Sequence, residues 1–214
     1  MTPTIRTLLI LARAAALTLP LLCAAPALAR AGDATRVIRK ANDRFQELLA
    51  RAAKPGSAEE KQLTDTMTRE LRDLFDIRDL ARRALVDHWD GMKPAERDEV
   101  VLLLQKLVEK NYVKSLRSRL KVQVDYKVET PQGDTVLVRT VVRAEKKGRP
   151  VDIAVDYVLG RDAAGAALRV FDVVTDDVSM LKNYRSQFNR IIAKEGVAGL
   201  LARMRAKDAK AKTD

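Results

Sequence analysis

The spacing of apolar residues changes period twice along the chain, which predicts helices, then strands, then helices again. Ser57 followed by Glu60 is a capping box that starts a second helix, and a third covers about 77–86. Pro94 suits the first turn of a long helix that runs to about Arg117. A first helix over 33–53 is predicted by apolar residues at helical spacing, namely Val37, Ile38, Ala41, Phe45, Leu48 and Leu49.

A period of two follows and predicts four strands. In the first strand, Val122, Val124, Tyr126 and Val128 alternate with polar residues, so they share one face. Further strands are predicted at 135–144, 151–159 and 168–174, with glycine- or proline-containing turns between them. Consecutive strands joined by short turns predict an antiparallel meander with one apolar face and one solvated face.

The C-terminal part returns to helical spacing. An apolar stripe, Leu181, Tyr184, Phe188, Ile191 and Ile192, is interrupted at Gly196, and Leu200, Leu201 and Met204 begin a final helix. The predicted fold class is α+β, an antiparallel four-stranded curved sheet wrapped by helices. Periodicity leaves open whether the space between sheet and helices is packed core or an apolar cavity.

The N-terminal residues have the three parts of a secretory signal peptide. Arg6 is basic, 14–22 is an apolar stretch, and Ala27-Leu28-Ala29 is a small-x-small cleavage pattern. We therefore expect 1–29 to be a cleaved signal peptide, 30–206 a single domain, and 207–214 a disordered basic tail. Cleavage removes Cys23, so the mature chain is expected to have no disulfide and no thiolate chemistry.

Positive charge narrows the range of partners. Loss of Arg6 and Arg13 with the signal leaves 38 basic against 29 acidic residues, a net charge of +9. Such a balance favours anionic lipid headgroups or acidic protein faces. Nucleic acid is not expected, because the protein is predicted to be exported and its aromatic residues do not interleave with basic ones. Candidate docking residues are the turn Lys146-Lys147-Arg149 and the helical Lys182, Arg185 and Arg190.

Motifs for catalysis are absent from the sequence. The single histidine, His88, is paired with no nucleophile motif, and neither a metal-ligand set nor a phosphate loop is present. We therefore expect a protein that is not an enzyme and binds no cofactor or metal. Two alternatives stay open: a small cone-fold enzyme with Asp172 as an acid/base carboxylate in an apolar pocket, and a periplasmic interaction module with a solid core.

An ordered set of short segments resembles one known family. The segments are Phe75-Asp76-Ile77, Ala84-Leu85 with Trp89, Tyr112, Val155 to Leu159, Val170 to Val173, Val178-Ser179 and Asn183 to Phe188. Together they resemble the MlaC family, also called the toluene-tolerance auxiliary family. Asp176-Asp177 departs from that pattern, because the family usually has glycine near this step.

The resemblance implies a function and a location. Members are periplasmic phospholipid-binding proteins that carry lipid between an inner-membrane ABC transporter and an outer-membrane lipoprotein complex, and help maintain outer-membrane lipid asymmetry. It also implies an apolar pocket between sheet and helices, which we expect towards the upper end of the ~300–1,000 Å³ range of ligand pockets. The residues predicted to line it and bind lipid are Leu80, Leu104, Val108, Tyr112, Val124, Val138, Val155, Tyr157, Val170, Leu181, Tyr184 and Phe188.

Overall fold

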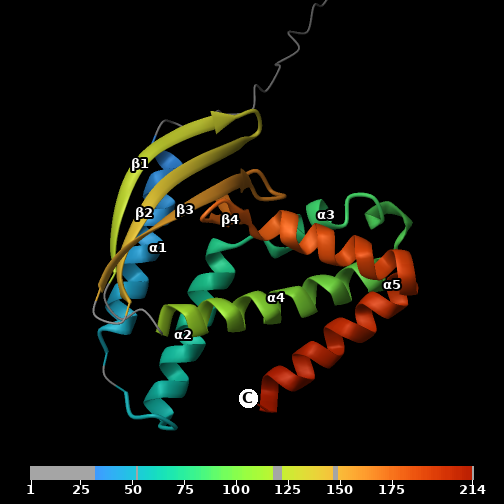
Figure 1. The fold of residues 1–214 in the computed structure, drawn as a ribbon, viewed down its shortest axis with the longest axis horizontal. Helices are drawn as coiled ribbons and strands as arrows, with labels where there is room; N and C mark the ends of the chain where they lie inside the picture. The colour runs from blue at the N-terminus through green and yellow to red at the C-terminus, as the bar shows by residue number, and fades with distance from the viewer. Residues whose placement is uncertain (1–31, 52, 118–121, 147–148, 214) are drawn as a thin grey trace, which may run out of the picture.

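The protein has a curved antiparallel sheet with helices packed on the inner side of the curve (Figure 1). The computed structural model describes residues 32–51, 53–117, 122–146 and 149–213. The predicted signal peptide lies outside the described residues. Within these ranges, no helix combines the length and the apolar character that crossing a bilayer requires.

The sheet follows chain order, β1-β2-β3-β4-β5, which confirms the meander and the α+β class. Its strands are β1 (Gln123–Gln132), β2 (Thr135–Lys146), β3 (Arg149–Arg161), β4 (Leu168–Thr175) and β5 (Val178–Ser179). The sheet therefore has five strands and not four. The fifth strand has only two residues, which is too short to produce a periodic pattern in the sequence.

A β-bulge in β1 changes which side chains face inward. The register with β2 shifts between Tyr126 and Val128, so Val128 pairs with Arg139 and is 46% exposed. The prediction that Val128 shares the apolar face with Val124 is wrong for this reason. Glu129 takes the inward position instead and accepts hydrogen bonds at the start of the first helix.

The first helices follow the predicted order. They are α1 (Asp33–Leu49), α2 (Ala58–Leu74), α3 (Ile77–Ala84), the short 3₁₀ helix η1 (Trp89–Gly91) and α4 (Pro94–Arg117). Helices α1 and α3 end earlier than predicted, and α4 has the predicted limits. Half of the predicted capping box is present: Ser57 Oγ accepts from the Glu60 amide at 3.2 Å. The Glu60 carboxylate accepts from the Gly56 amide at 2.5 Å, one residue before the N-cap, because the Ser57 amide donates to the Lys54 carbonyl.

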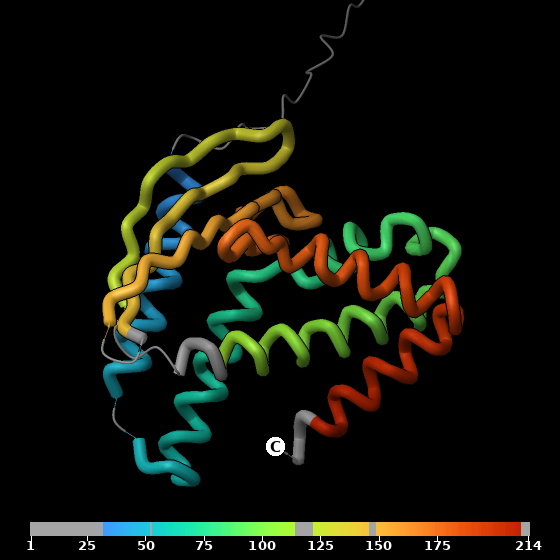
Figure 2. Tube along the Cα trace, viewed as in Figure 1, coloured from blue at the N-terminus to red at the C-terminus, as the bar shows by residue number. Residues whose placement is uncertain are grey.

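Helix α5 (Met180–Thr213) consists of two arms joined at Gly196. Gly196 has φ 68° and ψ −177°, which only glycine adopts without strain. The second arm turns back along α4 (Figure 2), where Arg205 makes two hydrogen bonds to Glu99 at 2.6 and 2.7 Å. The helix continues to residue 213 where a disordered tail was expected, and Asp208 forms an ion pair with Lys106 of α4.

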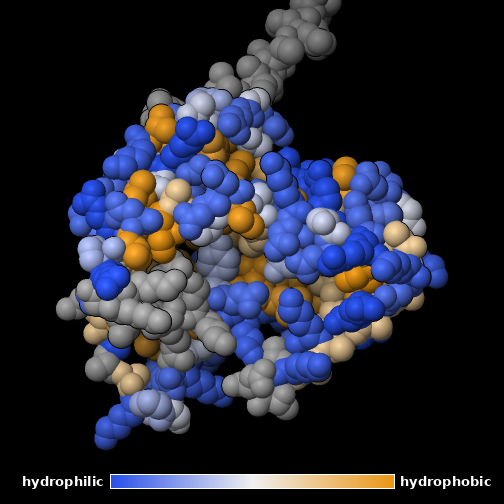
Figure 3. All heavy atoms as spheres, in the orientation of Figure 1, coloured by the Kyte–Doolittle hydropathy of each residue, from blue (hydrophilic) through white to orange (hydrophobic). Residues whose placement is uncertain are grey.

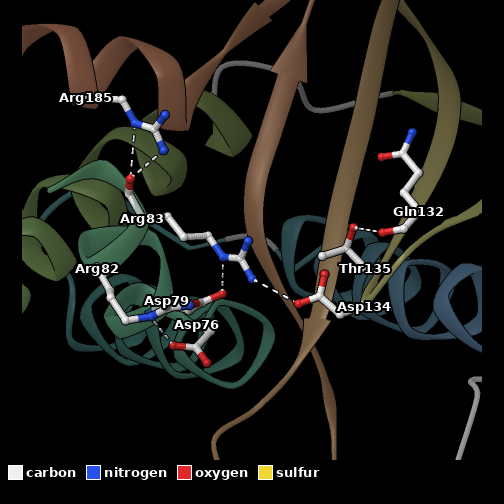
Figure 4. Close-up of polar contacts among 8 residues, drawn as sticks. All are labelled: Asp76, Asp79, Arg82, Arg83, Gln132, Asp134, Thr135 and Arg185. Carbon is white, nitrogen blue, oxygen red and sulfur yellow. Dashed lines mark hydrogen bonds and ion pairs between the residues drawn. The ribbon is translucent and has the colours of Figure 1, made fainter. Parts of the chain in front are cut away.

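A group of polar contacts joins α5, α3 and the β1–β2 turn (Figure 4). The Arg185 guanidinium donates to the backbone carbonyl of Arg83 at 2.7 and 3.2 Å. The Arg83 side chain in turn pairs with Asp79 at 2.7 Å and lies 3.9 Å from the Asp134 carboxylate. Arg185, predicted as a docking residue, therefore holds the first arm of α5 against the end of α3.

Candidate functional site

A cavity of about 400 Å³ lies between the inner face of the sheet and helices α1, α4 and α5. In Figure 3 apolar residues gather in the hollow between the sheet and α4. The volume is nearer the lower end of the range for ligand pockets, so the expectation of a larger pocket is wrong. The described residues that line it are Asn42, Gln46, Leu49, Val108, Asn111, Tyr112, Val122, Val124, Val142, Val155, Tyr157, Val173, Thr175, Val178, Met180, Asn183 and Tyr184.

The strand register places the β-strand residues of this lining on one face of the sheet. Val124 lies opposite Val142 on β2, and Tyr157 lies opposite Val173 on β4. Directly opposed residues of antiparallel strands project to the same side, and Val155 lies between the two pairs on the same face of β3, so these side chains form one apolar wall. The alternation of apolar and polar residues in the sequence produces this wall.

The β4–β5 turn forms part of the cavity rim. Asp176 and Asp177 have φ of 46° and 67°, so two consecutive non-glycine residues adopt the left-handed conformation of a tight hairpin turn. The Asp176 carboxylate accepts from the Ala154 amide at 3.2 Å, which ties the turn to β3. The turn leaves Val178, which lines the cavity, 64% exposed at the rim.

Three tyrosines from three elements meet at the cavity: Tyr112 of α4, Tyr157 of β3 and Tyr184 of α5. The Tyr112 ring packs edge-on against Phe75 at 5.0 Å between centroids, and the Tyr184 ring lies 5.5 Å from that of Phe188. Burial raises the pKa of the Tyr112 phenol well above its ordinary value, and the neighbouring Tyr157 acts in the same direction. The Tyr112 phenol therefore stays protonated at physiological pH and remains a hydrogen-bond donor.

The polar groups that border the cavity are neutral. Asn42 and Gln46 come from α1, Asn111 from α4 and Asn183 from the start of α5. None of the described residues in the lining carries a formal charge. Such a wall suits a ligand whose enclosed part is uncharged, because an ion there would lose its hydration without a counter-charge.

The structure places the twelve predicted lining residues in two groups. Those that border the cavity are Val108, Tyr112, Val124, Val155, Tyr157 and Tyr184. Those that do not border it are Leu80, Leu104, Val138, Val170, Phe188 and Leu181; the first five are buried in the core, and Leu181 is half-buried and packs against it. Contact of the first group with lipid remains a prediction.

Sequence reasoning missed the contribution of α1 and half of the sheet wall. Val142 has the same parity as the predicted Val138 on β2, so strand alternation could have identified it. Val173 has the opposite parity to the predicted Val170 on β4, and both face inward because the register of β3 and β4 shifts between Val158 and Leu159, which alternation does not show. Asn42 and Gln46 are polar residues on the flank of an amphipathic helix, and no pattern marks them as cavity residues.

Asp172, the proposed acid/base residue of the enzyme alternative, has a structural role. Its carboxylate accepts from the Ser179 hydroxyl at 2.6 Å and from the Leu181 amide at 2.9 Å. The Ser179 hydroxyl also accepts from the Lys182 amide at 3.0 Å. Asp172 and Ser179 therefore satisfy amides in the first turn of α5, and Asp172 is not among the described residues of the lining.

The other candidate chemical groups lie away from the cavity. His88 Nε2 is 3.1 Å from Asn189 Oδ1, and the Asn189 amide donates to the Asp87 carboxylate. These contacts hold the segment between α3 and η1 against α5. Within the described ranges, no three His, Cys, Asp or Glu side chains are grouped as a metal site would require.

Comparison with known proteins agrees with this architecture. A solved phospholipid-binding protein from Ralstonia solanacearum, in complex with a phospholipid, has a similar fold, with a TM-score of 0.68 and 22% sequence identity. The alignment covers 84% of this chain and 99% of that one. No curated protein sequence matches. The sequence model of the family described as "MlaC protein" matches residues 39–206, so the chain belongs to the MlaC family.

Proposed function

We propose that this protein is a periplasmic phospholipid carrier that holds acyl chains in the cavity between its sheet and helices. The observation that carries the proposal is the open cavity of about 400 Å³, whose described lining is mostly apolar and carries no formal charge. The phospholipid bound by the Ralstonia solanacearum protein of similar fold supports the same ligand class. A solid-core interaction module would have side chains filling this space.

Hydrophobic transfer explains why a carrier needs such a cavity. At ~0.8 kcal/mol per buried CH₂, two tails of about 16 carbons represent on the order of 25 kcal/mol. A carrier must offset most of that free energy, or the lipid stays in its membrane. We propose that the tails enter the cavity and that the charged phosphate stays at the mouth, because the described lining offers no cation to neutralise it.

Release of the lipid into water would be slow for the same reason, so delivery requires direct docking. We propose an inner-membrane ABC lipid transporter and an outer-membrane lipoprotein complex as the two partners, a route that maintains outer-membrane lipid asymmetry. Arg149, Lys182 and Arg190 are exposed and suit acidic partner faces. Lys147 of the predicted docking turn lies outside the described residues.

The test compares lipid carried by purified variants. The chain, expressed with its own signal sequence, is purified from the periplasm, and its lipid content is measured by native mass spectrometry and organic extraction. Val155→Asp places a carboxylate in the wall, and Val124→Asp does so at a half-buried site, where folding tolerates it better. Val128→Asp introduces the same charge on the outer face of β1 and is the control.

We expect wild type and Val128→Asp to carry phospholipid, and Val124→Asp and Val155→Asp to lose most of it while circular dichroism remains native. A wild-type protein without lipid would refute the carrier function. Full lipid content in a folded Val124→Asp protein would show that the lipid lies elsewhere.

A further inference from the structure

The cavity contains donors that hydrocarbon tails cannot use. Tyr112 and Tyr184 line it, and within the described part of the chain neither hydroxyl has a hydrogen-bond partner. The Tyr112 hydroxyl is close enough to Tyr184 and Tyr157 to interact with both electrostatically, so the phenols of three elements are grouped. A tyrosine hydroxyl is a good donor and usually finds an acceptor when it is buried.

A ligand that fills the cavity would displace the water that these two hydroxyls can reach. Partial burial already raises the pKa of both Tyr112 and Tyr184, and because the described residues offer neither hydroxyl an acceptor, the ligand would have to supply one. Phenylalanine would fill the same space without an unpaired hydroxyl. The rings are also held by Phe75 and Phe188, so the two hydroxyls keep fixed positions and are preorganised for an acceptor.

A diacyl phospholipid has such acceptors at one place only along its enclosed part. Its two ester carbonyls lie where the acyl chains join the glycerol, on the tail side of the phosphate. Resting on the proposed carrier function, we propose that Tyr112 and Tyr184 donate hydrogen bonds to these ester carbonyls and so select ester-linked lipid over ether-linked lipid. The phenols also fix how deep the lipid lies, because the tails extend inward from that point.

Ether lipids provide a direct test, since dialkyl phosphatidylcholine has the same headgroup and chain length but no carbonyl. Delipidated protein is loaded from mixed micelles with equal amounts of dipalmitoyl and dihexadecyl phosphatidylcholine, and bound lipid is quantified by mass spectrometry. Tyr112→Phe and Tyr184→Phe remove one donor each with the ring retained. Tyr126→Phe is the control, because the Tyr126 hydroxyl accepts from Asn42 at 2.8 Å and Tyr126 is not in the described lining.

We expect wild type and Tyr126→Phe to prefer the ester lipid by about threefold to tenfold, the effect of one or two buried hydrogen bonds. We expect the double variant Tyr112→Phe/Tyr184→Phe to load both lipids equally. Equal loading by wild type would overturn the role of the phenols and leave the carrier function intact. Failure to load either lipid would instead overturn the carrier function.

Discussion

Glu129 connects the sheet to the first helix, and its removal should destabilise the protein in a pH-dependent way. The carboxylate accepts from the Gly32 amide at 3.0 Å, the Thr35 amide at 2.8 Å and the Thr35 hydroxyl at 2.6 Å. Burial opposes ionisation of this carboxyl, but the hydrogen bonds outweigh it and hold the pKa below its ordinary value. The site is also the N-terminus of a helix, where a negative charge is favourable.

The size of the effect follows from these bonds. In Glu129→Gln one amide oxygen can keep the Thr35 contacts, but the new NH₂ group faces the Gly32 N–H, and the charge is lost. Hydrogen bonds to a charged group contribute about 1.5–3 kcal/mol each, so we expect a loss of about 2 kcal/mol at pH 7. In a domain of this size that lowers Tm by about 4–8 °C.

Thermal unfolding measured from pH 7 to pH 3 provides the assay, with the exposed Glu145→Gln as control. A depressed folded-state pKa means that the stabilisation is fully present above the unfolded-state value near 4.5 and is lost as pH falls through the folded-state value. The gap between wild type and Glu129→Gln should therefore narrow in acid. A gap that is absent at pH 7, or unchanged at pH 3, would refute this reasoning.

Two backbone positions give opposite predictions for the free energy of unfolding, both measured by denaturant titration. Asp177→Gly should stabilise the protein by about 1 kcal/mol, because Asp177 has φ 67° in the β4–β5 turn and glycine removes that strain; a loss of stability would mean that the aspartate side chain supports the turn. Gly196→Ala should destabilise it by about 1–3 kcal/mol, since alanine at φ 68°, ψ −177° strains the joint of α5. Gly91→Ala, where an added methyl meets no atom within 4 Å, is the control and should change little.

Periodicity predicted most of the fold because it reflects burial directly. The order of the strands follows from apolar spacing, and the limits of α4 follow from that spacing together with Pro94 at its first turn. The bulge at Val128 was not predictable in this way, because a one-residue register shift leaves the sequence alternation unchanged and is decided by the partner strand. The helical end of α5 depends on contacts with α4, such as that between Asp208 and Lys106, which are distant in sequence.

Half of the twelve residues predicted to line the site border the cavity, and helix α4 shows why the prediction was incomplete. Leu104, Val108 and Tyr112 form one stripe on α4, but Leu104 is fully buried in the core while the other two border the cavity. A stripe identifies the inward side of a helix and not the point along its length where packing ends. Strand parity was more reliable: Val124, Val155 and Tyr157 all face the cavity.

One end of the interior is closely packed and the other contains the cavity. This arrangement explains how the fold can be stable although part of its interior is open. At the end of the sheet that holds Val138, Leu159 and Val170, these residues are almost fully buried, and Asp76 N donates to the Val170 carbonyl at 2.8 Å, which fixes α3 to the sheet. Towards the other end, where Val124, Val142 and Val173 lie, the side chains of sheet and helices leave the cavity. Close packing at one end supplies the stability that the cavity cannot, because atoms beside a void lose dispersion contacts. Lipid in the cavity would restore those contacts, so its loading should stabilise the fold without rearranging the packed end.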